Sequence, residues 1–266
     1  SLSKANENQI LKLWEGLGYY RRARDLLASA KLLVKKYNSK LPDDLKELKK
    51  LPGIGEYTAN ALLGLVYDKP TIAIDGNVKR IFARYLNKKE IGINFEKLIS
   101  INKKKLFSTN RNSDFVEALM EFGALVCKPK DPKCGGCCLN KSCRYFKSSH
   151  KIKTNERKKI KIMHYDIFCY LNKSKRIALT KENKFGFLKN SNLPSIKKMK
   201  NIKKNKNWKF LKNYKNSISN QKLNINLYYK FSNKIPLSHK WYPLNNNKEF
   251  IPSFTKKIFQ QVSVLF

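Results

Sequence analysis

The chain has 266 residues, enough for two domains of ordinary size, each with its own hydrophobic core. Lysine and arginine number 57 against 19 acidic residues, which gives a formal charge of +38 and a pI near 10.0. This excess predicts a polyanionic partner, although lysine and asparagine are abundant everywhere and AT-rich codons explain part of it. We find no apolar run of membrane-spanning length and no signal peptide, so a membrane protein is not expected.

Apolar residues at three-to-four spacing predict helices through the first half of the chain. The expected helices span residues 6–16, 21–37, 42–50, 56–66, 75–86, 95–106 and 113–126. Short helices joined by short loops indicate a compact bundle and not a repeat array.

The pattern changes in the second half. The charged, apolar-poor stretch from Lys147 to Lys161 is typical of an interdomain linker. Beyond it, alternating residues predict strands at 164–171, 175–180 and 225–231, followed by a closing helix at 253–265. We therefore expect a helical domain at 1–146, a linker at 147–161 and a smaller α+β domain at 162–266.

The stretch from Leu51 to Val78 combines a glycine-rich hairpin with an acid. Gly53 and Gly55 suit a tight turn that leaves backbone N–H groups bare at a helix start, where phosphate binds. Asp75 follows the apolar run 71–74, and this order suggests chemistry on a nucleic acid. A plain helix N-cap is the alternative for Asp75.

Four cysteines lie close together before the linker. They are Cys127, Cys134, Cys137 and Cys143, at a C-x6-C-x2-C-x5-C spacing. Clustered thiols without nearby histidine indicate zinc or a [4Fe–4S] cluster. A single Cys-x2-Cys pair with long flanks favours iron–sulfur. Cys138 is an extra thiol, and Cys169, in an expected strand, is interpreted as a small buried residue.

Three motifs in order give a specific resemblance. LPGIGEYTA, IDGNVKR and the cysteine spacing together resemble the helix-hairpin-helix, iron–sulfur superfamily of DNA glycosylases that includes endonuclease III. GLGYY and the second domain make the chain similar to adenine DNA glycosylases of the MutY type. The resemblance is dense from Leu13 to Cys143. It implies a mostly α helix-hairpin-helix domain with a [4Fe–4S] loop, followed by a smaller α+β Nudix-like domain.

The resemblance also implies an active site. Asp75 matches the carboxylate that stabilises the sugar cation, and Tyr57 and Asn77 match residues lining the adenine and sugar pocket. Endonuclease III-like enzymes carry an attacking lysine where this chain has Tyr57, so the implied reaction stops at base removal by water. A core aromatic is the alternative for Tyr57, and an ordinary helix-start residue is the alternative for Asn77.

DNA contacts follow from the same resemblance. Tyr19 corresponds to a wedge beside the partner base, with Tyr20 as the buried aromatic of the turn; a buried turn residue is the alternative for Tyr19. The phosphate-holding hairpin and the nearby charges are Leu51, Gly53, Ile54, Gly55, Arg21, Arg22 and Lys79.

Two departures from the family are visible. The Phe-Ser-His loop that reads 8-oxoguanine stands here as Ile218-Ser219-Asn220, so Ser219 is retained as a contact or is an ordinary turn residue. The family's general-acid glutamate, on an early helix, has no match, and Glu15 is not a substitute. We expect a partial chain with little activity by itself. No acidic Nudix metal helix is present, so recognition without nucleotide hydrolysis is expected.

The favoured function is a monofunctional adenine glycosylase acting on duplex DNA with A:8-oxoG or A:G mispairs. It is expected to be a monomer in the bacterial cytoplasm, associated with the nucleoid. An endonuclease III-like pyrimidine glycosylase and a non-catalytic DNA-binding fragment are the alternatives.

Overall fold

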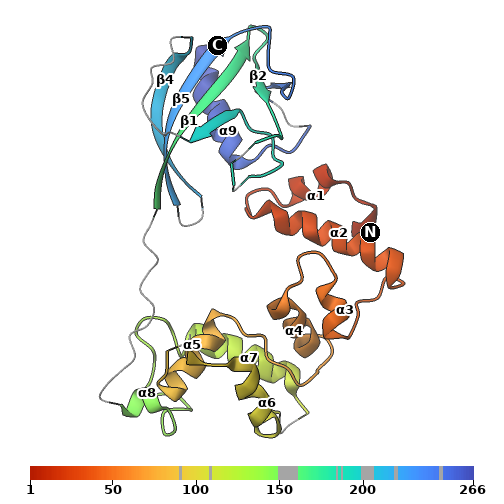
Figure 1. Cartoon of the computed structure of the whole chain (residues 1–266), viewed down its shortest axis with the longest axis vertical. Helices are drawn as coiled ribbons and strands as arrows, with labels where there is room; N and C mark the ends of the chain where they lie inside the picture. Colours follow the sequence, from red (N-terminus) through yellow and green to blue (C-terminus); the bar gives the residue numbers. More distant parts are fainter. Residues whose placement is uncertain are drawn as a thin grey trace. The chain divides into compact units, whose positions relative to one another are not determined.

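The computed structural model describes residues 1–89, 92–107, 110–148, 161–183, 185–186, 188–198, 207–218, 221–245 and 248–266 (Figure 1). They form two compact units. The helical unit holds residues 25–157 with Leu2, and the sheet unit holds Ser1, residues 3–24 and residues 158–266. The second boundary lies near the expected one, but residues 3–24 group with the C-terminal part and not with the helices. Most of the expected linker lies outside the described residues.

The helical unit follows the predicted helices closely. Its elements are α2 (Tyr20–Lys36, whose first turn belongs to the sheet unit), α3 (Leu45–Lys49), α4 (Glu56–Leu65), α5 (Gly76–Leu86), α6 (Phe95–Leu106), α7 (Asn112–Leu125) and α8 (Arg144–Lys147). The sequence did not predict α8, because a single turn is too short to show an apolar period.

The core of the helical unit forms where α3 and α4, the two helices on either side of the glycine hairpin, meet. Leu48, Leu51, Ala59 and Leu63 are buried together, joining α3 to α4. Helix α7 approaches α4 closely, because a Cβ on Gly64 would lie 2.7 Å from Cγ2 of Val116. Apolar packing of this kind fixes the position of the loops between the helices.

The sheet unit combines a mixed sheet with helices from both ends of the chain. It contains a 3-10 turn at Leu2–Lys4, α1 (Glu7–Leu13), β1 (Lys161–Asn172), β2 (Arg176–Leu179), β3 (Ser195–Lys198), β4 (Lys209–Ile218), β5 (Gln221–Phe231), β6 (Lys240–Pro243), α9 (Ser253–Val262) and a final 3-10 turn, Ser263–Leu265. The strand order is β4-β5-β1-β2-β6, with β3 also paired to β1. Strands β1 and β5 are parallel, with Ile167 opposite Leu227.

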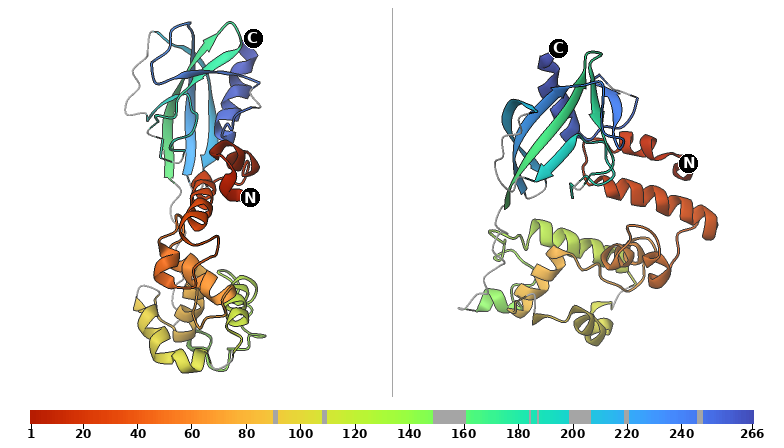
Figure 2. Two further views of the ribbon diagram at one scale, coloured as in Figure 1. Left: turned by 90° about the vertical axis from the view of Figure 1, so that its right-hand side faces the viewer. Right: turned by 45° about the horizontal axis from the view of Figure 1, so that its top comes forward.

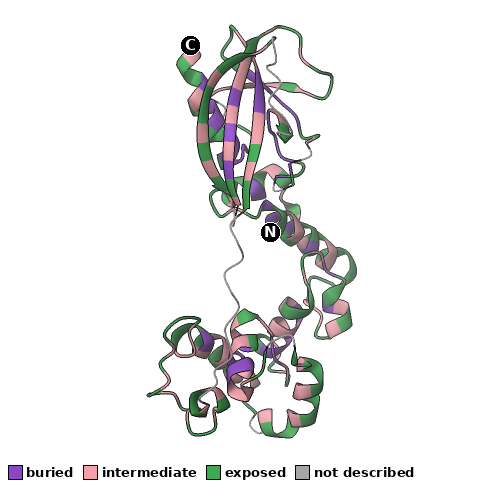
Figure 3. Cartoon of the chain, turned by 60° about the vertical axis from the view of Figure 1, so that its left-hand side comes forward, coloured by how far each residue is buried: buried purple, intermediate pink, exposed green. Residues whose placement is uncertain are grey.

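One face of the sheet packs against α9 (Figure 2). The side chains between them are almost fully buried and include Ile167, Leu171, Leu223, Ile225, Leu227, Ile258 and Val262, all at most 1% exposed. The alternate residues of the same strands are more open, and Figure 3 shows this alternation along the strands. A sheet with one packed face and one solvated face has this burial pattern.

Strands β3, β4 and β6 were not predicted from the sequence. Strand β4 lies at the edge of the sheet, and its sequence KFLKNYKNSI places lysine or asparagine on both faces. Edge strands tolerate such polar residues because one side has no strand partner. Polar residues on both faces interrupt the apolar–polar alternation from which a strand is predicted.

The N-terminal helix belongs to the sheet unit through specific contacts. Asn6 and Gln9 form a capping box that starts α1. The Asn8 side chain accepts a hydrogen bond from the Phe250 backbone N–H (2.6 Å) and donates one to the Lys248 carbonyl (3.2 Å). Among the described residues, no helix is both long and apolar enough to cross a membrane.

Candidate functional site

Asp75 is the N-cap of α5, and both of its carboxylate oxygens accept hydrogen bonds. Oδ1 accepts from the Val78 backbone N–H at 2.7 Å, and Oδ2 accepts from Asn77 Nδ2 at 3.0 Å. The capping alternative from the sequence is therefore correct. It does not exclude chemistry, because the cap holds a negative charge at a helix N-terminus in one fixed orientation.

Arg80 fixes the second residue of this site. Its Nη2 donates to Asn77 Oδ1 (2.7 Å) and to the Gly123 carbonyl (2.6 Å), while Nε donates to the Cys127 carbonyl (2.8 Å). A Cβ on Gly123 would lie 2.5 Å from Cβ of Asn77, so α7 can approach α5 here only with glycine. Asn77 is thus held from three directions and is more than a helix-start residue.

Tyr57 lies in the first turn of α4 and is not a core aromatic. Its side chain is 43% exposed. It lines a pocket of about 710 Å³ together with Lys79, Glu56 and Ile74. The structure thus places Tyr57 and Lys79 at one pocket, whereas Asp75 is the residue directly after Ile74 and does not itself line it.

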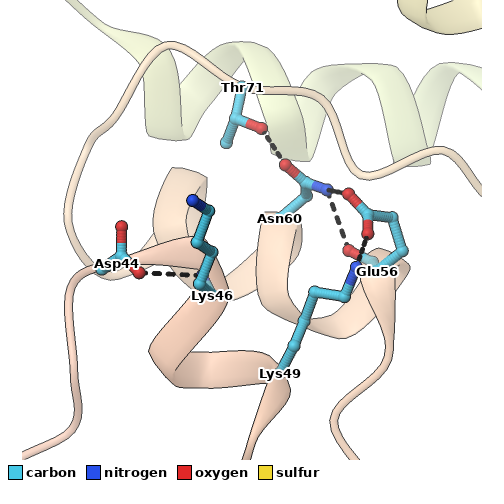
Figure 4. Close-up of polar contacts among 6 residues, drawn as sticks. All are labelled: Asp44, Lys46, Lys49, Glu56, Asn60 and Thr71. Carbon is cyan, nitrogen blue, oxygen red and sulfur yellow. Dashed lines mark hydrogen bonds and ion pairs between the residues drawn. The ribbon is translucent and has the colours of Figure 1, made fainter.

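Polar side chains brace this end of α4 (Figure 4). Lys49 forms an ion pair with Glu56, whose Oε1 accepts from Asn60 Nδ2 at 3.3 Å. Asn60 Oδ1 in turn accepts from the Thr71 hydroxyl, at the start of the segment that leads to Asp75. The hydrogen bond from Lys49 lowers the pKa of Glu56, so this carboxylate is unsuited to donate a proton near neutral pH.

The glycine hairpin has the expected positive φ at Gly53 but not at Gly55, whose backbone is extended. Gly53 has φ +78°, and a Cβ there would lie 2.7 Å from Cβ of Asp25. Gly55 is the N-cap of α4 and supplies no side-chain acceptor, so the first-turn N–H groups keep their binding capacity for a phosphate. Ile54 is partly buried. Leu51 is only 2% exposed, so its side chain belongs to the core.

The GLGYY turn separates its two tyrosines. Tyr19 has φ +47° and is 67% exposed, whereas Tyr20 is 7% exposed and packs edge-on against Phe250 at 4.8 Å between ring centroids. The Arg22 guanidinium lies over the Tyr19 ring at 5.4 Å, and Arg21 is exposed. Tyr19 is therefore the exposed tyrosine of the turn, and Tyr20 has the structural role.

A second pocket, of about 290 Å³, lies within the sheet unit beside this turn. Tyr19, Asn216, Ser217, Ile218 and Ser253 are among the residues that line it. Ser219 and Asn220 lie outside the described residues. The sequence did not indicate Asn216 and Ser217, because their contribution depends on β4, which was not predicted.

The four cysteines line one small pocket of about 30 Å³. Their sulfur atoms attract N–H donors: the Leu139 N–H bonds Cys137 Sγ, and Arg84 Nη1 bonds Cys127 Sγ, each at 3.4 Å. Within the described parts of the chain, no group of three or more His, Cys, Asp or Glu side chains is arranged to hold a metal ion. Cys169 is fully buried, as expected, and burial raises its pKa.

Arg84 is a functional candidate that the sequence pattern did not single out. It is 3% exposed and donates to the carbonyls of Lys128 (2.6 Å) and Pro129 (3.0 Å). Both carbonyls lie in the segment 127–143 that carries the four cysteines, here called the cysteine loop. Its guanidinium also lies 5.4 Å from the centre of the Tyr145 ring. The signal was present, since Arg80 and Arg84 stand four residues apart on one face of α5.

Glu15 forms an ion pair with Lys256 of α9.

The chain is similar to known proteins in both sequence and fold. Residues 1–106 match the model of the HhH-GPD superfamily of base excision DNA repair proteins. Among solved structures, a thermostable thymine-DNA glycosylase is 28% identical with a TM-score of 0.50, over 55% of this chain and 68% of that chain. The match identifies the class as helix-hairpin-helix DNA glycosylases.

The curated relatives narrow the class. The adenine DNA glycosylase of Buchnera aphidicola subsp. Baizongia pistaciae is 32% identical over 270 residues, 92% of this chain and 75% of the relative. That of subsp. Schizaphis graminum is 38% identical over 61% of this chain, and the match spans 48% of the relative's length. The chain therefore belongs to the adenine DNA glycosylase family.

Proposed function

We propose that this protein removes adenine from A:8-oxoG or A:G mispairs in duplex DNA by hydrolysing the N-glycosidic bond. The observation that carries the proposal is the carboxylate of Asp75, held at the N-terminus of α5 by Val78 and Asn77. The glycine hairpin before α4 supplies the phosphate-binding N–H groups in the same unit.

The chemistry follows from these side chains. The adenine must leave the helical stack, at a cost of a few kcal/mol. As the glycosidic bond breaks, positive charge develops on the sugar, and a fixed carboxylate stabilises it. Asp75 supplies this charge and Asn77 keeps it oriented. Tyr57 carries no amine, so no Schiff base and no strand cleavage by that route are expected.

A second carboxyl group is needed to protonate the departing base. Glu56 is kept ionised by Lys49, and Glu15 is paired with Lys256. Neither is suited to this role. We therefore expect slow adenine release by the 266-residue chain.

Recognition of the partner base is assigned to the sheet unit, which we interpret as the Nudix-like module of the family. Its pocket joins Tyr19 to Ser217 and Ile218, the residues directly before Ser219. A pocket that combines an exposed tyrosine with polar groups suits stacking on a purine and reading of its edge. We expect a monomer that acts at the bacterial nucleoid.

We propose further that Cys127, Cys134, Cys137 and Cys143 hold a [4Fe–4S] cluster. Four thiols at one pocket and N–H donors directed at two sulfur atoms support this donor set, although the described side chains are not arranged around a metal ion in this structure. The bound cluster would cross-link the loop through four thiolates. Brown protein with about four iron atoms per chain supports this assignment; a colourless protein with stoichiometric zinc contradicts it.

The test of function compares two N-cap substitutions in the helical unit. Asp75→Asn keeps a capping side chain but removes the charge, and Asp44→Asn does the same at α3, where Asp44 caps Lys46 and Glu47. Adenine release is measured in single turnovers on A:8-oxoG, A:G and oxidised-pyrimidine duplexes. The assay uses the 266-residue chain and a version preceded by the family's acid-bearing helix.

We expect Asp75→Asn to slow adenine release by about 100-fold or more and Asp44→Asn to leave it unchanged. Cleavage at oxidised pyrimidines with a trapped Schiff base would instead favour the endonuclease III-like alternative. Duplex binding without excision in either version would favour the non-catalytic alternative.

A further inference from the structure

The face of the sheet that points away from α9 carries a band of aromatic side chains. Phe168 of β1 stands opposite Tyr228 of β5, and Tyr228 stands opposite Phe210 of β4. Side chains of directly paired residues lie on the same face. Their sequence neighbours Ile167 and Leu227 are 0% exposed in the core beneath α9, so the three aromatic residues lie on the opposite face, here called the outer face.

The rings of this band form one contiguous surface. Phe168 and Tyr228 stack at 5.3 Å between centroids with 16° between their planes, and Phe210 lies 5.6 Å from Tyr228. Trp208 extends the band, at 5.0 Å from Phe168 and 4.7 Å from Tyr170.

The band is not closed off as a second core. Phe168, at the centre of the band, is only 7% exposed, but Phe210 is 53% exposed, and Tyr228, Trp208 and Tyr170 are each partly exposed. Aromatic surface of the kind that is usually buried in a folded domain is therefore exposed at the edge strand β4, at Phe210. An aromatic surface of this kind on a soluble domain indicates a binding site.

Lysine side chains share the outer face with the band. Lys197 Nζ lies 5.7 Å from the centre of the Phe168 ring. Lys230 follows Tyr228 by two residues and therefore shares its face, and Lys215 and Lys222 lie on that face of β4 and β5. All four lysines are exposed.

The acid on this face is already engaged. Asp166 Oδ1 accepts a hydrogen bond from Asn226 Nδ2 at 2.8 Å, and Asn226 Oδ1 accepts from Asn213 Nδ2 at 2.9 Å. The net charge presented beside the rings is positive, which complements a polyanion and disfavours a basic or neutral protein surface.

We propose that the outer face binds single-stranded DNA, with unpaired bases on the aromatic band and phosphates at the lysines of the same face. Proteins that bind single strands without sequence preference use this combination of stacking surfaces and a positive border. A duplex fits less well, because its bases are already stacked and paired. The proposed site belongs to the sheet unit and Asp75 to the helical unit, and the proposal does not depend on the proposed excision reaction.

Fluorescence anisotropy of a labelled, lesion-free oligo-dT tests the aromatic band. Phe210→Ala and Tyr228→Ala are each expected to weaken binding about ten-fold, the usual effect of removing one stacking ring. Phe266→Ala is the matched control, since that ring is 39% exposed and packs on Phe231, outside the band. Phe210 is exposed at an edge, so its substitution leaves the fold intact, and circular dichroism checks this.

The lysines are tested by salt dependence. Replacing Lys197 and Lys230 together with alanine is expected to reduce the slope of log K against log salt by about 0.7 for each phosphate that the two side chains neutralise. Lys35→Ala, at an exposed position on α2, leaves the slope unchanged. An unchanged slope in the double variant would contradict the assignment of the lysines.

Trp208 gives the location of binding. The chain has 3 tryptophans, so replacing Trp14 and Trp241 with phenylalanine leaves Trp208 as the reporter, and oligo-dT is expected to quench its fluorescence.

Equal affinity of Phe210→Ala and wild type for oligo-dT, or displacement of oligo-dT by a stoichiometric lesion duplex, overturns the proposal. Tighter binding of oligo-U through the same residues overturns the choice of DNA. Adenine release, measured separately, is unaffected by Phe210→Ala.

Discussion

At the residue scale, the candidate site rests on groups that serve structure and chemistry together. Asp75 caps the N-terminus of α5 by accepting a hydrogen bond from the Val78 N–H, and its second oxygen accepts one from Asn77. A residue with two such bonds has little freedom to rotate, and preorganised charge stabilises a transition state without further rearrangement. The N-cap is therefore part of the site and not an alternative to it.

Gly53 provides a stability prediction at the same scale. Its φ of +78° disfavours any L side chain, and the Cβ of Gly53→Ala would lie 2.7 Å from Asp25 Cβ. We expect a loss of about 1–3 kcal/mol in the free energy of unfolding, measured by urea denaturation. Gly55→Ala is the control, because Gly55 has extended backbone and no atom within 4 Å of an added Cβ. Equal stability of the two variants would show that the hairpin relaxes without strain.

The residue patterns of the site were predictable in part. The spacing of Gly53, Gly55 and Asp75 along the chain indicated a hairpin and a capped helix, and both are confirmed. The resemblance implied the separate places of Tyr19 and Tyr20, and the structure agrees, with Tyr19 exposed and Tyr20 buried. Arg84 was not predicted, because its spacing from Arg80 shows only that the two share a helix face, and its carbonyl partners in the loop cannot be read from the sequence.

At the element scale, α5 joins the candidate site to the cysteine loop. Arg80 bonds Asn77 and Cys127, and one turn later Arg84 bonds Lys128 and Pro129. Residues four apart lie on the same helix face, so one face of α5 holds both features.

Substituting Arg84 tests this arrangement. Arg84→Leu leaves the Lys128 and Pro129 carbonyls without their buried donor, which is expected to cost about 2–4 kcal/mol of unfolding free energy. Loosening the loop should also lower the visible absorbance per chain if a cluster is bound. Lys79→Leu, at an exposed position on the same helix, is the control for stability. Unchanged stability and absorbance in Arg84→Leu would show that the loop is held by other contacts.

Elements were predicted where one face of each is apolar. The helices other than α8, and strands β1 and β5, have such a face and were predicted to within a few residues. Strand β4 was missed because Lys212, Asn213 and Lys215 interrupt its alternation, and β6 because Lys240–Pro243 is too short to show a period.

At the scale of the whole molecule, the order of the chain and the order of packing differ. Residues 3–24 pack with residues 158–266, so the sheet unit contains both the first and the last described helix of the chain. No sequence pattern predicts this, since Asn8 and Phe250 are 242 positions apart and only the fold brings them together.

Tyr20 tests that packing. Its ring is 7% exposed against Phe250, and Tyr20→Ala is expected to remove about 3–5 kcal/mol from the stability of the sheet unit. The change can be followed by the fluorescence of Trp241 during urea unfolding. Tyr19→Ala, one residue earlier and 67% exposed, should change stability by less than about 0.5 kcal/mol. Equal effects of the two substitutions would mean that α1 and the start of α2 do not stabilise the sheet.

The shared packing has a consequence during synthesis on the ribosome. Ile10 and Leu11 of α1 are buried in the finished sheet unit, yet the residues that complete that unit are made last. At about 5–20 residues per second, the interval between residue 24 and residue 250 is about 11 to 45 seconds. During that time the apolar side of α1 has no native sheet to cover it, so this segment should be a binding site for chaperones until translation ends.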